Sequence, residues 1–151
     1  MSETRTISGF FQGDHDRLDA LLQSFQALKR ENLSKAKDAF TRFKSGLERH
    51  IRWEEEILFP LWEDKTGMVD GGPTFVMRHE HRRIEEQLRA IDQNLVQDNA
   101  DDAEPEQALL AMLAAHNLKE ERVLYPAIDQ ATTPEERSGI LKHIQDFPED
   151  R

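Results

Sequence analysis

Six residues whose side chains commonly bind metal ions are placed in this chain by one rule. In each of two copies, a lone histidine precedes a His-x-x-x-Glu motif by 35 residues, and the copies are offset by 66 residues. Imidazole nitrogens and carboxylate oxygens are ligands of divalent metals. The types and spacing therefore predict a metal site built from both copies by His15, His50, Glu54, His81, His116 and Glu120.

The repeat extends well beyond these six residues. The same offset pairs apolar positions along the chain, such as Leu22 with Leu88 and Leu47 with Leu113. It also pairs Glu-Glu-Ile-Leu-Phe-Pro in the first copy with Glu-Arg-Val-Leu-Tyr-Pro in the second, as residues 55–60 and 121–126. The repeated unit is therefore a piece of structure, and we expect the two copies to pack around a pseudo-two-fold axis.

The positions of the two motifs on their helices suggest how the site is built. Residues four apart lie on one face of a helix, so each motif directs an imidazole and a carboxylate inward together. A glutamate in an apolar stripe is costly to bury unless it is paired or bound to metal. We expect two metals, each held by the two histidines of one copy, with Glu54 and Glu120 bridging them. One solvent-derived bridge would complete five ligands and leave a position open.

Residues near this site have alternative roles. Buried arginines could pair with Glu54 and Glu120, but the inner faces supply no obvious basic residue. The side chains interpreted as lying just behind the ligands, or packing beside the site, are Glu55, Glu121, Met77 and Tyr125. Phe59 and Tyr125 are interpreted mainly as packing residues, although the Tyr125 hydroxyl could reach a bridging ligand. His79 and His143 are expected on the surface.

Composition limits the classes of protein to consider. The 151 residues fit one domain, 1–151, and the absence of cysteine excludes disulfides and thiolate metal sites. A net charge of −10 disfavours binding to nucleic acid. No run is long and apolar enough for a membrane span, and the first residues do not resemble a signal peptide. We therefore expect a cytoplasmic protein without a membrane or nucleic-acid partner; a protein partner is unknown.

Apolar residues recur at helical spacing, which predicts an all-α, antiparallel, up-down four-helix bundle over about residues 7–130. Each copy would contribute one helix hairpin. The second helix is expected to begin after an N-cap at Ser34, to be kinked near Pro60 and to end at Gly67. The third begins at Pro73, and Thr133 starts a capping box for a short C-terminal helix over about 133–146.

The full ordered series, His15, His50-x-x-x-Glu54, Glu80-His81 and His116-x-x-x-Glu120, resembles the hemerythrin-like HHE cation-binding domain. The resemblance covers about residues 7–130. It implies a non-haem di-iron centre, oxo- or hydroxo-bridged, inside a four-helix bundle, although manganese or zinc would suit the same ligands. Ferritin-like sites use the reverse order, Glu-x-x-His, which the site segments here lack.

The chain departs from classical oxygen-carrying hemerythrins at two points. Those proteins have a further histidine where Met77 stands here, and they end the series with His-x-x-x-x-Asp, whereas Glu120 here makes the two halves alike. This favours binding, sensing or reducing dioxygen, peroxide or nitric oxide over reversible oxygen carriage. Any enzymatic activity would be a weak oxidoreductase or peroxidase type. The alternatives are an iron-responsive structural or regulatory module, an iron-handling module, and a plain interaction bundle without metal.

Overall fold

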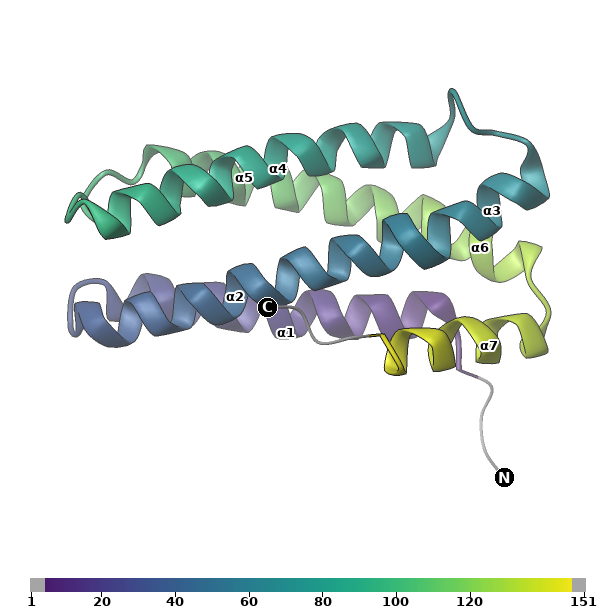
Figure 1. Cartoon of the computed structure of the whole chain (residues 1–151), viewed down its shortest axis with the longest axis horizontal. Coiled ribbons are helices and arrows are strands. Elements are labelled where there is room, and N and C mark those ends of the chain that lie inside the picture. The colour runs from purple at the N-terminus through teal and green to yellow at the C-terminus, as the bar shows by residue number, and fades with distance from the viewer. Residues whose placement is uncertain (1–4, 148–151) are drawn as a thin grey trace.

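The chain runs up and down through a bundle of antiparallel helices. The computed structural model describes residues 5–147, and every regular element in that range is helical, which confirms the all-α prediction. Figure 1 shows α2 continuing into α3 as one rod, and α7 folded back beside the bundle. The elements are α1 (Ile7–Leu28), α2 (Leu33–Trp53), η1 (Glu54–Leu58), α3 (Phe59–Thr66), α4 (Pro73–Val96), α5 (Glu104–Lys119), η2 (Glu120–Leu124), α6 (Tyr125–Ala131) and α7 (Pro134–Gln145).

Local capping chemistry explains where several helices begin. The predicted N-cap of the second helix at Ser34 is wrong: the side chain of Asn32 accepts the Lys35 N–H at 3.1 Å, and α2 begins at Leu33. Asparagine caps as well as serine does, and Asn32 comes first in the chain. The capping box at Thr133 is present as predicted. Gly72, at φ 97°, supplies the backbone conformation from which α4 starts at Pro73.

Two π-helical turns interrupt the rods, one in each copy of the repeat. The Phe59 N–H bonds the Glu54 carbonyl in η1, and the Tyr125 N–H bonds the Glu120 carbonyl in η2. The next residue in each copy is a proline, which has no N–H and whose ring would crowd the carbonyl four residues earlier. Widening the turn relieves this conflict. The predicted kink near Pro60 therefore takes the form of a wide turn that begins at a candidate ligand.

The apolar core is divided into two clusters along the bundle. One contains Leu18 and Leu113 and lies toward the α1–α2 connection, and the other contains Phe11 and Leu124 and extends to α7. The candidate metal ligands occupy the layer between the two clusters, since His15 lies between Phe11 and Leu18 on α1. None of the helices within residues 5–147 is long and apolar enough to cross a membrane.

Candidate metal centre

All six predicted ligand side chains converge in the layer between the two apolar clusters. They come from α1, α2, η1, α4, α5 and η2, and none is more than 4% exposed. Because each motif spans the junction of an α-helix with a π turn, the histidine and glutamate of a motif still share one face. The structure thus brings together every residue that the repeat singled out.

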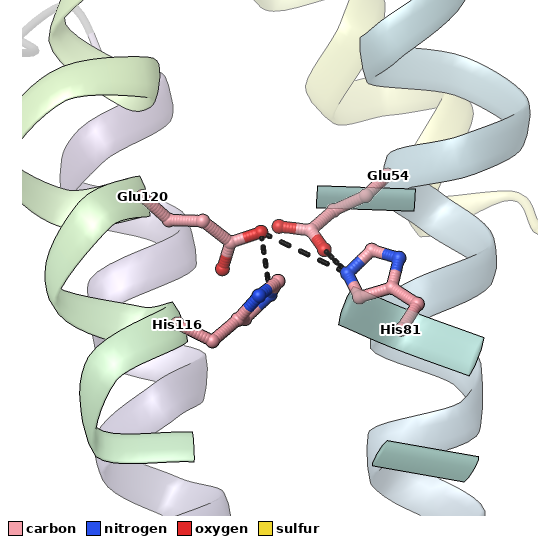
Figure 2. Close-up of side chains that lie close together, drawn as sticks. All are labelled: Glu54, His81, His116 and Glu120. Atoms are coloured by element: carbon pink, nitrogen blue, oxygen red, sulfur yellow. Dashed lines mark ion pairs between the residues drawn. The ribbon is translucent and has the colours of Figure 1, made fainter. Parts of the chain in front are cut away.

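Each glutamate offers one oxygen to each pair of histidines. Oε2 of Glu54 lies 3.5 Å from Nε2 of His50, and Oε1 lies 3.1 Å from Nε2 of His81. Oε1 of Glu120 lies 3.2 Å from Nε2 of His15, and its Oε2 lies 3.1 Å from Nε2 of His116. Figure 2 shows the half formed with His81 and His116. This geometry suits two cations, each beside the histidines of one copy and bridged by both carboxylates.

A carboxylate holds the other nitrogen of each histidine. The four contacts join Asp14 to His50 (2.8 Å), Glu55 to His81 (2.6 Å), Glu80 to His116 (2.8 Å) and Glu121 to His15 (2.7 Å). An ionised carboxylate only accepts hydrogen bonds, so Nδ1 of each ring donates and Nε2 faces the centre. In a neutral ring that Nε2 carries the lone pair that binds metal.

Two of these four carboxylates, Asp14 and Glu80, were not singled out for this role from the sequence. A signal was available, because they are themselves related by the 66-residue offset and each directly precedes a lone histidine. They face the histidine of the neighbouring helix and not the one beside them in the chain. Basic side chains form ion pairs with three of the four carboxylates that contact the histidines: Arg17 with Asp14 at 2.9 Å, Lys119 with Glu80, and Arg82 with Glu55.

The electrostatics of the layer favour positive charge between the two glutamates. Burial alone would raise the pKa of Glu54, but His50 and His81 outweigh it and hold the pKa well below its usual value. Burial alone would lower the pKa of His50, yet Glu54 and Asp14 reverse this and raise the pKa to about 10. Burial would likewise lower the pKa of His81, but Glu54 and Glu55 outweigh it and raise the pKa to about 9. Without metal, protonated His50 and His81 therefore supply the positive charge beside Glu54 that metal ions would otherwise supply.

Tyr125 contributes a buried hydroxyl to one half of the site. It lies 2.5 Å from Oε2 of Glu54 and 2.9 Å from Oε1 of Glu120. In an α-helix, residues five apart point about 140° away from each other, whereas a π turn returns to the same side after about five residues. The π turn at Glu120 is thus what brings Tyr125 into the site. Burial, with Glu120 and Glu54 close by, raises the pKa of Tyr125 well above its usual value.

Three buried atoms test whether the residues fit a metal. Within the described part of the chain, Oε1 of Glu54, Oε2 of Glu120 and Nε2 of His81 make no hydrogen bond of acceptable geometry and meet as ion pairs, with His116 close to Glu120. Buried polar atoms are nearly always satisfied, and all three of these atoms face one another. Nitrogen and oxygen donors at such spacing, backed by oriented histidines, fit a metal ion of the iron, manganese or zinc type.

Comparison with known proteins identifies the family. The family described as Hemerythrin HHE cation binding domain matches residues 6–144. The chain belongs to this family. Within curated proteins, this hemerythrin-family chain is similar to "Iron-sulfur cluster repair protein YtfE" from Dickeya chrysanthemi (strain Ech1591), with 32% identity over 91 residues. The match covers 56% of this chain and 41% of that relative's length. No solved structure matches the chain.

The remaining predicted residues of this hemerythrin-family site lie around its edge. Met77 is 2% exposed and belongs to the apolar cluster that contains Phe11, its counterpart in the repeat. It therefore supplies packing where oxygen carriers would have a further histidine. His79 and His143 are exposed and take no part in the site.

Proposed function

We propose that this chain binds two iron ions in the layer between the apolar clusters and uses them to bind, sense or reduce a small oxidant. The candidate ligands are the four histidines with Glu54 and Glu120. The observation that carries the proposal is that each glutamate places one carboxylate oxygen beside each of the two histidine pairs. That arrangement suits a bridged pair of cations. A single metal would leave half of these donors without a purpose.

Two considerations support iron. The donor set contains only nitrogen and oxygen, which exclude metals that require thiolate ligands but admit iron, manganese and zinc. Among these, the family resemblance and the name of the relative both favour iron. The proposal therefore takes iron as the resident metal and treats manganese and zinc as competitors for the same ligands.

The surroundings of the site favour a small substrate. All six candidate ligands are buried, and apolar clusters lie on both sides of them. Dioxygen, hydrogen peroxide and nitric oxide are small enough to reach such a layer. Two ferrous ions together could supply the two electrons that, with two protons, reduce one hydrogen peroxide to two waters. The chain's own contribution is to orient the histidines and to exclude bulk water.

The similarity to a protein named for iron–sulfur cluster repair favours one alternative, in which the bound iron is handled and not used for turnover. Because the chain has no cysteine, it could not hold a cluster through its own thiolates. Under this alternative, iron would be released or delivered, and the spectrum of the reduced protein would not respond to an oxidant.

Metal analysis and optical spectroscopy test the proposal. Protein purified from iron-supplemented cells should contain close to two irons per chain, and His50→Ala and His116→Ala should each lower that content strongly. His79→Ala is the matched control, because His79 is exposed on the same helix as His81. Adding peroxide or dioxygen to the reduced protein should produce a charge-transfer band. Background iron in the unaltered protein would reject the metal site, and a full iron content with a silent spectrum would favour iron handling.

A further inference from the structure

The internal repeat provides its own comparison for Tyr125. Its counterpart is Phe59, which has the same buried position after the other π turn but no hydroxyl. The ring of Phe59 stacks on that of His81, with centroids 5.9 Å apart and planes 5° from parallel. At this position the two halves, each with two histidines backed by carboxylates, differ by one oxygen atom.

That oxygen lies among the four donor atoms of one half. It is 3.4 Å from Nε2 of His15 and 3.4 Å from Nε2 of His50, in addition to its contacts with one oxygen of each glutamate. Adjacent ligands of an octahedral metal with bonds of about 2.1 Å lie about 3 Å apart. The Tyr125 oxygen thus has the spacing of a ligand that is adjacent to all four of the others.

Among residues 5–147, no hydroxyl takes the equivalent place in the other half. The three buried atoms on Glu54, Glu120 and His81 that make no hydrogen bond all belong to this half, where Figure 2 marks only ion pairs between the glutamates and the histidines. In the first half, the corresponding carboxylate oxygens both contact the Tyr125 hydroxyl. Within that range, the carboxylate oxygens therefore have a hydrogen-bond partner in the half that contains tyrosine and lack one in the half that contains phenylalanine.

We propose that the Tyr125 oxygen is a fifth protein ligand for the metal beside His15 and His50, which leaves the position for a small external molecule beside His81 and His116. This inference rests on the proposed function, since it needs a metal in each half. Coordination to a ferric ion forms an iron–oxygen bond in place of the O–H bond, and the proton leaves to solvent. No electron transfer is required.

The competing role for Tyr125 is structural. Its hydroxyl could simply hold the two glutamates in position without touching a metal. In that case Tyr125→Phe would lower the affinity for both metals alike and would not alter the electronic spectrum of the ferric protein. The two roles therefore predict different spectra from the same substitution.

The experiment compares Tyr125→Phe, Phe59→Tyr and the unaltered chain, each loaded with two ferric ions and checked for helix content. The unaltered protein should show a visible absorption band from a phenolate oxygen to ferric iron, and Tyr125→Phe should lose it. Phe59→Tyr keeps Tyr125 and should add a second such band. In a titration with cobalt(II) against a chelator, the unaltered protein should bind in two unequal steps, and Tyr125→Phe should weaken the tighter step about ten- to a hundredfold.

The outcomes separate this inference from the proposed function. If the unaltered protein takes up two irons but its spectrum matches that of Tyr125→Phe, the ligand role of Tyr125 is overturned while the metal site stands. If the unaltered protein binds neither iron nor cobalt, the proposed function fails and the ligand role fails with it. If Tyr125→Phe does not fold, the second band expected from Phe59→Tyr decides, and its absence would overturn the proposal.

Discussion

Oδ2 of Asp14 lies 2.8 Å from Nδ1 of His50, across 36 positions of the chain and between two neighbouring helices. Glu80 holds His116 at the same distance and with the same separation. Each contact sets which ring nitrogen faces the centre of the bundle. The orientation of a candidate ligand on one helix is thus controlled from the helix packed against it.

Removing one of these outer carboxylate charges should weaken metal binding without removing a ligand. We expect Glu80→Gln and Asp14→Asn each to lower metal affinity by about ten- to a hundredfold, because the histidine loses its strong acceptor. Chelator competition measures this. Glu86→Gln is the control, since Glu86 is exposed on the same helix as Glu80. An equal loss in the control would mean that the effect is not specific to the ring contact.

The stability of the metal-free protein should fall as the pH rises. In the folded state the pKa of His50 is about 10 and that of His81 about 9, compared with about 6.5 for an unfolded histidine. From about pH 6.5 upward the unfolded chain has lost these protons while the folded chain keeps them. The contribution of these two histidines to the free energy of unfolding should therefore be complete below about pH 6.5 and should decline between about pH 6.5 and pH 10.

Glu54 sets the acid side of the same profile. Its pKa is held below the usual value, so its contribution is present above about pH 4.5 and is lost as the pH falls. Urea denaturation of the metal-free protein at several pH values should give a maximum at about pH 5 to 6.5. His50→Gln should flatten the alkaline decline, and a profile that rises between pH 7 and 9 would contradict the assignment of the protons.

Metal binding near neutral pH should release protons. Because His50 and His81 are protonated in the metal-free fold, a metal must displace those protons to reach Nε2. In a weakly buffered solution at pH 7, an indicator dye should therefore report acidification as metal is added. Stoichiometric uptake with no proton release would show that the rings are already neutral.

A substitution in the apolar core should separate folding from metal binding. Leu88 is fully buried in the cluster toward the α1–α2 connection. Leu88→Ala should lower the free energy of unfolding by about 2–5 kcal/mol through the cavity it creates. The number of metals bound per chain should be unchanged, as measured by denaturation and metal analysis in parallel. A lost metal site would show that this cluster also sets the ligand geometry.

The periodicity of the sequence predicted the helices and the face that each presents, because the apolar stripe and the histidines have the same helical spacing. The position of Tyr125 was harder to predict. Helical periodicity assumes about 3.6 residues per turn, and a π turn breaks that assumption at the point where it matters for the site. A proline six residues after an inward glutamate, as Pro60 follows Glu54 and Pro126 follows Glu120, is the local signal that the turn will widen.

The contacts of Asp14 and Glu80 escaped prediction for a different reason. They depend on which helix packs against which, and on the rotation of each rod. A single sequence gives the inward face of each helix more reliably than the partner of a side chain at its border. Asn32 replaced Ser34 as the cap for a simpler reason, since both side chains are competent and the chain adopts the earlier one.

The layer of histidines and glutamates separates the buried apolar side chains into two clusters, one toward each end of the bundle. Without metal, the contacts inside the layer are made by histidines and carboxylates whose pairing depends on protons, and the helices that pass through it connect the two ends. Each end could then open by itself, as a separate cooperative unit. Bound metal would link the helices at the layer, so that the two ends unfold as one cooperative unit. Amide exchange at the two ends should then report the same opening free energy when the ions are bound.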